Sequence, residues 1–125
     1  MYAIVALSSE MLRNTALIDD RVYGGLAIYL LTALLFASIH RHISALDQAA
    51  YSTPLAGDAV RFSWDQSLYF SLSTITTVGY GDIFPKSTWA RSACVTESVT
   101  GVFLSIVFIA RLAALPTPQR KHEQH

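Results

Sequence analysis

The most distinctive chemistry in this sequence lies in the segment from 74 to 85, TITTVGYGDIFP. Gly79 and Gly81 alternate there with larger residues, and glycine readily adopts the positive φ angles that most residues avoid. Such alternation keeps successive carbonyl groups on one side of the chain, free of helix or strand hydrogen bonds. A row of these oxygens can replace the water around a cation in a narrow passage. The segment therefore predicts a backbone site for a dehydrated cation.

A second candidate is Glu97, the only charged residue in the apolar run from Ser92 to Ala110. A carboxylate inside a membrane span is costly and rarely faces lipid. It could face a neighbouring helix and brace the glycine-containing segment through a hydrogen bond. It could instead reach the outer interface partly hydrated, or serve only in packing between subunits. We favour bracing, because Glu97 lies six residues inside Arg91.

Other side chains with ligand chemistry give weaker signals. His40 and His42 are two residues apart, so a helix would direct them about 200° apart. That geometry is poor for one metal ion, and we interpret both as polar residues of the membrane interface. Their titration near neutral pH could still influence activity. Cys94, the one cysteine, is interpreted as a small apolar helix residue.

The overall composition excludes most soluble classes of protein. Charged residues are 14% of the 125 residues, against about 25% in ordinary soluble proteins. Hydrophobic residues are 52%, the mean hydropathy is +0.37 and the formal net charge is zero. We therefore expect a membrane protein with no nucleic-acid partner. The sequence contains no nucleophile–base pair at membrane depth, metal-ligand cluster or phosphate-binding loop, so neither an enzyme nor a cofactor is predicted.

Two apolar stretches must position the candidate residues. Residues 22–39 are 18 uncharged residues, and a helix of that length spans roughly 27 Å, close to the thickness of the hydrocarbon layer. The second stretch is the run that contains Glu97. With their flanks, these stretches predict an outer membrane-spanning helix over 22–42 and an inner one over 91–115. Residues 1–21 are expected to form an amphipathic segment at the interface, and residues 116–125 a short cytoplasmic tail.

The connection between the two spans is expected to enter the membrane and turn back. Residues 43–63 contain Pro54 and Gly57 and are predicted to be an exposed loop. Residues 64–76 then predict a helix of roughly 20 Å, too short to cross a bilayer. Irregular backbone after such a helix is tolerated at membrane depth only where protein buries it or it lines water. The predicted fold is therefore all-α, with two membrane-spanning helices, a short re-entrant helix and an irregular loop that follows it.

Lysines and arginines orient the chain weakly. Two precede the first span and three follow the second, whereas four lie in the connection. Five against four favours both termini in the cytoplasm. The protein is predicted to be an integral, multi-pass membrane protein, and so small a pore suggests the inner or plasma membrane of a prokaryote, or a virus.

The segment from Thr77 to Gly81, followed by Asp82, resembles the selectivity filter of potassium channels. The order of helix, short helix, filter and helix over roughly 22–115 is similar to that of the two-transmembrane potassium channels of bacteria and archaea. The resemblance implies a potassium-selective channel that conducts K+ passively. It implies four identical chains around one pore, because each chain supplies one wall of the ring. The ion-binding oxygens would be those of Thr77, Val78, Gly79 and Tyr80, with Gly81 closing the filter.

The resemblance also assigns supporting roles. Asp82 matches an aspartate that bonds an aromatic residue of the pore helix, here Tyr69, where the family usually has tryptophan. Ser73 stands where some bacterial members carry a glutamate. Whether this chain shares the filter inactivation of those members is therefore in doubt. Gly101, 20 residues after the last filter glycine, matches a gating hinge, although close helix packing is the alternative. The remaining matches are cavity-lining candidates, namely Thr76, Ser105 and Ile109.

Three alternatives stay open at this stage. The chain could be a non-conducting membrane subunit that retains a pore fold, or the pore of a larger gated channel. A non-selective cation pore is the third, although such relatives lack the tyrosine that Tyr80 supplies. The expected partners are further copies of the chain, the lipid bilayer and K+. Gly24 and Gly25 are expected to let a neighbouring helix approach closely.

Overall fold

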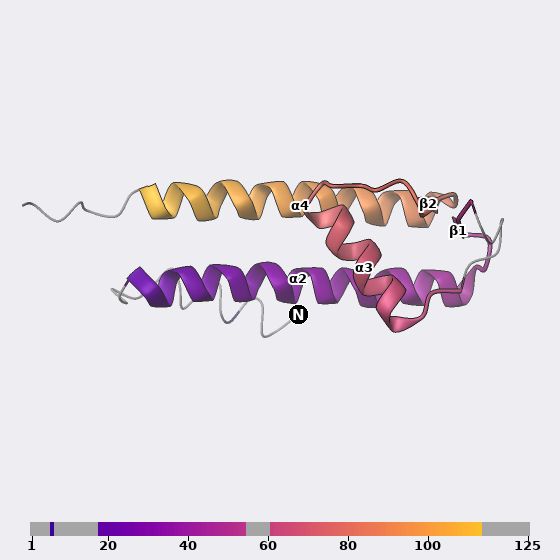
Figure 1. Ribbon diagram of the computed structural model, residues 1–125, viewed down its shortest axis with the longest axis horizontal. Helices are drawn as coiled ribbons and strands as arrows, with labels where there is room; N and C mark the ends of the chain where they lie inside the picture. The colour runs from indigo at the N-terminus through magenta and orange to yellow at the C-terminus, as the bar shows by residue number, and fades with distance from the viewer. Residues whose placement is uncertain (1–5, 7–17, 55–60, 114–125) are drawn as a thin grey trace, which may run out of the picture.

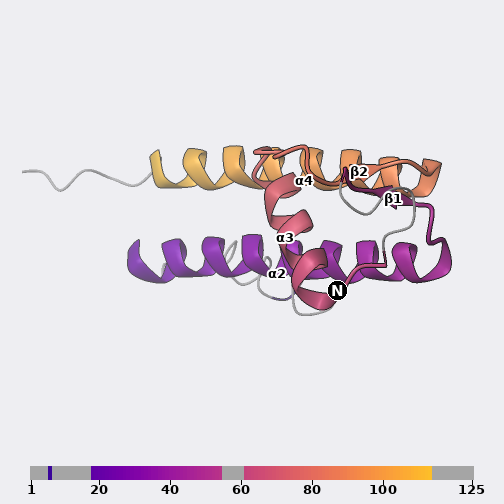
Figure 2. The ribbon, with the colours of Figure 1, turned by 45° about the vertical axis from the view of Figure 1, so that its right-hand side comes forward.

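Two long helices form the frame of the protein. The computed structural model describes Ala6 and residues 18–54 and 61–113. Helices α2 (Ile18–Leu46) and α4 (Thr88–Ala113) lie side by side (Figures 1 and 2). The predicted amphipathic segment and cytoplasmic tail lie almost wholly outside the described residues. The predicted all-α class with two apolar helices is confirmed.

Both long helices are long and apolar enough to cross a membrane, over Val22–Leu46 in α2 and along the whole of α4. They extend further than the predicted ranges of 22–42 and 91–115 at every end that the structure describes. Helix α2 begins four residues earlier and ends four residues later, and α4 begins three residues earlier. The prediction stopped near charged residues. A helix need not stop there, because its backbone bonds continue unchanged in the polar interface.

The short helix α3 (Trp64–Ile75) crosses obliquely between the long helices (Figures 1 and 2). Ser63 caps its first turn, accepting a hydrogen bond from the Gln66 amide while the Gln66 side chain accepts one from the Ser63 amide. A hydrogen bond from the Ser63 side chain also holds the pKa of the exposed Asp65 below its ordinary value. The helix has 12 residues, about 18 Å, which is too short to span a bilayer.

After α3 the chain runs back along α4 to the two-residue strand β2 (Phe84–Pro85), as Figures 1 and 2 show. This strand pairs antiparallel with β1 (Tyr51–Ser52), in the connection that follows α2. The Lys86 amide extends the pairing by donating to the Ala50 carbonyl at 2.8 Å. The connections before and after α3 are therefore joined to each other.

The prediction of an exposed loop over 43–63 is wrong for its aromatic residues. Tyr51 is fully buried and Phe62 is nearly so, and both pack on Phe70 of α3. The rings of Tyr51 and Phe62 lie 4.4 Å apart, centre to centre. The prediction followed the prolines, glycines and polar residues of the loop, whereas its aromatic residues fold back onto α3 and form a small core with Ala50 and Ala90.

Two glycines allow the helices to approach closely. A Cβ atom added to Gly25 would lie 2.4 Å from the ring of Phe108, so α4 packs directly on the backbone of α2 there. A Cβ atom at Gly101 would lie 2.3 Å from the carbonyl oxygen of Ile75, the last residue of α3. The expectation of a close helix approach is thus confirmed at Gly25. Gly101 and Phe108 are seven residues apart and share one face of α4.

Candidate functional site

The backbone after α3 has positive φ at every second residue. The angles are +60° at Thr77, +54° at Gly79 and +75° at Gly81. A Cβ atom at either glycine would meet nothing within 4 Å. These glycines are therefore required by the backbone angle and not by lack of space. The sequence predicted positive φ for the two glycines and gave no signal for Thr77.

Thr77 is the most unusual of these residues, because a β-branched side chain strongly disfavours positive φ. Of the described residues other than glycine, it alone has this conformation. Two hydrogen bonds to the last turns of α3 hold the turn. The Thr77 amide donates to the Thr74 carbonyl at 3.0 Å, and the Gly79 amide donates to the Ser73 carbonyl at 3.1 Å. Strained backbone of this kind tends to cluster at functional sites.

The side of the segment that faces away from α3 is open in the single chain. Every residue from 76 to 82 is exposed. Val78 is 54% exposed and Tyr80 is 68% exposed. A strained segment that is exposed along its whole length can offer its backbone oxygens to an ion. Other protein must then enclose the remaining sides of that ion.

Tyr69 and Asp82 hold the outer part of the segment against α3. The Tyr69 hydroxyl donates to the Asp82 carboxylate at 2.8 Å, and this bond first of all raises the pKa of Tyr69. The rings of Tyr69 and Tyr80 stack at 5.8 Å, with 12° between their planes. The pairing implied by the resemblance is thus present, with tyrosine in the place of tryptophan.

Ser73 takes part through its backbone and not through a link to Asp82. Its side chain is buried and donates to the Phe70 carbonyl at 2.9 Å, whereas its own carbonyl receives the Gly79 amide. The last turn of α3 is also contacted by both long helices. The Tyr29 hydroxyl of α2 donates to the Ile75 carbonyl at 2.9 Å, beside the Gly101 contact. No signal in the sequence indicated Tyr29.

Glu97 is fully buried behind α3, and its two carboxylate oxygens contact different helices. The Ser71 hydroxyl of α3 donates to one oxygen, and the imidazole of His40 on α2 lies 2.8 Å from the other. Ser71 also lies 2.7 Å from the Ala33 carbonyl oxygen of α2. The carboxylate therefore joins α2, α3 and α4 at one point, below the surface and behind the strained segment.

The interpretation of His40 as an interfacial residue is wrong. His40 is fully buried, and its second ring nitrogen lies 2.7 Å from the Tyr51 hydroxyl. His42 is exposed and donates locally to the Ser38 carbonyl at 2.7 Å. The angular separation expected for the two histidines places them on opposite faces of α2. One face turns inward because α2 continues beyond residue 42 and packs against α3.

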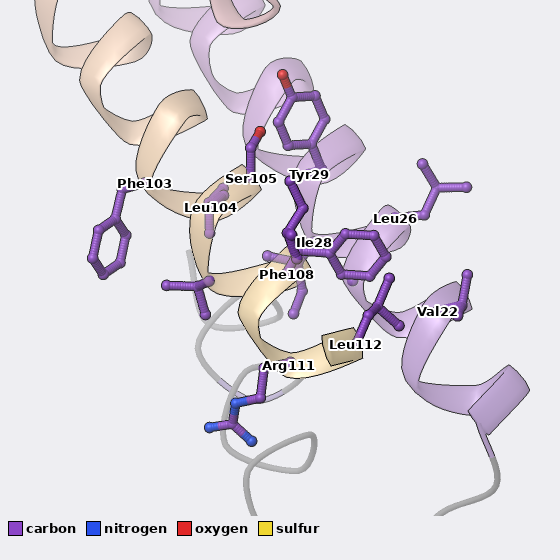
Figure 3. A pocket seen from close by; sticks show the side chains of 13 residues that line it. Val22, Leu26, Ile28, Tyr29, Phe103, Leu104, Ser105, Phe108, Arg111 and Leu112 are labelled. Atoms are coloured by element: carbon purple, nitrogen blue, oxygen red, sulfur yellow. The ribbon is translucent and has the colours of Figure 1, made fainter. Parts of the chain in front are cut away.

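The three cavity-lining candidates do not meet in one place within a single chain. Thr76, which directly precedes Thr77, is exposed, and its hydroxyl donates to the Leu72 carbonyl at 2.6 Å. Ser105, which bonds to the Gly101 carbonyl at 2.9 Å, lines a groove of about 540 Å³ between α2 and α4, together with Ile109. Figure 3 shows the ring of Phe108 in this groove between the two helices, with Arg111 at its open end.

Comparison with known proteins covers both the frame and the site. A family model described as an ion channel matches residues 26–117. "Potassium channel protein kcv" of Paramecium bursaria Chlorella virus 1 is 31% identical over 77 residues, which cover 62% of this chain and 80% of the viral protein. The family match includes α3 and the strained segment that follows it.

Two human proteins are also similar over shorter stretches. Potassium channel subfamily K member 17 is 43% identical over 49 residues, or 39% of this chain. Potassium channel subfamily K member 5 is 31% identical over 68 residues, or 53% of this chain. The chain spans 15% and 14% of the lengths of these two proteins. Because the family match extends over most of the sequence, the chain is an integral membrane protein that belongs to the ion-channel family, among the potassium channels built on two membrane-spanning helices.

Proposed function

We propose that this chain forms a potassium-selective channel that conducts K+ passively through a filter made by Thr77 to Gly81. The observation that carries the proposal is the alternation of φ sign along this segment, at the end of a short helix and on an open face. Alternating φ directs successive carbonyl oxygens to one side, where they replace the hydration shell of the ion.

Each ion site would be a ring of oxygens contributed by equivalent residues of several chains. The backbone oxygens of Thr77, Val78, Gly79 and Tyr80, with the Thr77 hydroxyl, would form successive rings along the pore. K+ would move between adjacent rings by repulsion from the ion that follows it. The C-terminal ends of the pore helices, which carry partial negative charge, would stabilise an ion in the cavity below. Both termini would then lie on the cytoplasmic side.

Four chains are proposed to surround the pore, because one chain supplies only one wall of each ring. The exposed apolar surface of α4 supports contact with neighbours and lipid, since large exposed apolar patches mark interaction sites. Its exposed large apolar residues on both sides of Gly101 are Trp89, Val95, Val99, Val102, Phe103, Ile106, Val107 and Ile109.

The conduction proposal is tested by cation flux from the purified protein in liposomes. We expect barium-sensitive flux of K+ and Rb+ that clearly exceeds that of Na+. Empty liposomes provide the baseline. Equal Na+ and K+ flux would contradict selectivity, and absence of flux across a range of pH and voltage would favour a non-conducting subunit.

The assembly proposal is tested by chemical crosslinking in mild detergent. We expect a ladder of one, two, three and four chains, with no larger species at high crosslinker concentration. A series that stops at two chains would contradict a closed ring of four. Protein denatured before crosslinking is the control for random collision.

A further inference from the structure

Tyr51 is connected to the chain on both sides of the filter. Its backbone lies in β1, where it pairs with Pro85 of β2, three residues after Asp82. The adjacent Ala50 carbonyl accepts the Lys86 amide at 2.8 Å. The segment that leaves the filter is thus held by β1 through backbone hydrogen bonds.

The side chain of Tyr51 connects to the helix that precedes the filter. Its hydroxyl lies 2.7 Å from Nδ1 of His40, and Nε2 of His40 lies 2.8 Å from Oε2 of Glu97. The hydroxyl of Ser71 donates to Oε1 of the same carboxylate. Ser71 precedes Ser73 by two residues, and Ser73 receives the Gly79 amide. We call these four side chains the buried network, and they are Tyr51, His40, Glu97 and Ser71.

The buried network has no access to water that could replace a lost partner. All four residues have 0% exposure. Both nitrogens of the imidazole and both oxygens of the carboxylate are engaged, so loss of any member leaves a buried polar atom unpaired. The imidazole is also enclosed by aromatic rings, with Phe70 at 5.0 Å and Phe36 at 6.5 Å between ring centres.

One tautomer of His40 gives the hydrogen bonds a single direction, from Tyr51 to Glu97. Burial, followed by the charges of Cys94 and Glu97, raises the pKa of the Tyr51 hydroxyl above its ordinary value. The hydroxyl therefore keeps its hydrogen and can donate it to Nδ1 of His40. The imidazole then has its hydrogen on Nε2 and donates it to Glu97. Donors from α2 and α3 thus converge on one carboxylate.

We propose that Tyr51 is a positioning residue for the filter. Its backbone holds the segment after the filter, and its hydroxyl, acting through His40 and Glu97, holds α3 before the filter. This inference rests on the proposed function, because it concerns the ion-selective state of that segment. It gives the connection after α2 a part in selectivity. Tyr51 acts on the filter through other residues and not by direct contact.

The test removes the hydroxyl of Tyr51 and keeps its packed ring. We expect Tyr51→Phe to fold, and to lower the ratio of K+ to Na+ flux by about tenfold, within the range typical of coupling between sites. Tyr23→Phe is the matched control, because the same atom is removed from a residue of α2 that is 70% exposed. An unchanged flux ratio in Tyr51→Phe would overturn the proposal.

The two ends of the buried network, Tyr51 and Ser71, provide a test of coupling. Tyr51→Phe and Ser71→Ala remove groups that are separated by two other side chains. If the four act as one unit, the double variant should lose little more selectivity than either single variant. Effects on the flux ratio that simply multiply would show that the two hydroxyls act independently. That result would overturn the claim that the four side chains act as one unit.

Hydrogen exchange at the Gly79 amide separates this inference from the proposed function, since it requires no conduction. That amide bonds to the Ser73 carbonyl at 3.1 Å and reports how firmly α3 holds the filter. We expect exchange about tenfold faster in Tyr51→Phe and unchanged in Tyr23→Phe. If the unaltered protein carries no selective flux, the proposed function fails while the exchange rates still decide the positioning role. Equal exchange rates in both variants and the unaltered protein would overturn that role.

Discussion

Replacing Gly79 with alanine should reduce K+ flux by at least about 100-fold. The residue has φ of +54°, where a Cβ atom costs about 1–2 kcal/mol per chain, and the cost would recur in every chain of the proposed ring. Within the single chain the added methyl group meets nothing within 4 Å. We therefore expect the loss to come from the backbone angle, and the chain still to fold and assemble. Liposome flux and crosslinking measure the two properties separately.

D-alanine at position 79, introduced by chemical synthesis, is the matched control for Gly79→Ala. It adds the same atoms but favours positive φ, so we expect it to retain most of the K+ flux. Unchanged K+ selectivity in the L-alanine variant would exclude Gly79 from the filter. Loss of flux in both variants would mean that the methyl group itself is harmful, and would contradict the role given to the backbone angle.

Replacing Glu97 with alanine should strongly destabilise the assembled protein. The change leaves the imidazole of His40 and the hydroxyl of Ser71 buried without their shared partner. A buried donor that loses its acceptor costs about 1–3 kcal/mol. We expect the assembly to dissociate at a clearly lower temperature, as measured by gel mobility after heating in detergent.

Glu97→Gln is the rescue variant for this prediction. Its amide oxygen can accept from Nε2 of His40 and its NH2 group can donate to the Ser71 hydroxyl, which still has the Ala33 carbonyl at 2.7 Å as an acceptor. Most of the lost heat resistance should therefore return. Thr96→Ala is the neighbouring control, because that exposed hydroxyl bonds only within α4, to the Ser92 carbonyl at 2.8 Å. Equal heat resistance of Glu97→Ala and the unaltered protein would remove the bracing role.

The parts of the site that depend on local backbone chemistry could be predicted from the sequence. Positive φ at Gly79 and Gly81 follows from their residue type, and the start of α3 follows from the capping pattern that begins at Ser63. The apolar helices follow from the length of their uncharged runs. Each of these signals lies within a few residues of the feature that it specifies.

The buried network could not be predicted in the same way, because its members are distant in sequence. His40 and Glu97 are 57 residues apart, and nothing near His40 marks it as buried. Glu97 gave a usable signal only because a carboxylate in an apolar run needs a partner. That requirement did not identify the partner, which depends on how α3 crosses α2.

Residue preference argued against two features that tertiary contacts impose. Threonine disfavours the positive φ found at Thr77, yet the carbonyls at the end of α3 bind the amides of the turn and hold it there. The polar composition of the connection after α2 favoured exposure, yet Tyr51 and Phe62 are buried against Phe70. In both cases packing around α3 outweighs the local preference.

The contacts at Gly101 and Gly25 limit how α4 can move. At Gly101 the helix rests on the Ile75 carbonyl, and seven residues later the ring of Phe108 rests on Gly25 of α2. Rotation of α4 about its own axis would bring a larger side chain against that carbonyl. A bend at Gly101 would carry Phe108 with it. A swing of the part of α4 after Gly101 away from α2 would therefore begin with the separation of Phe108 from Gly25.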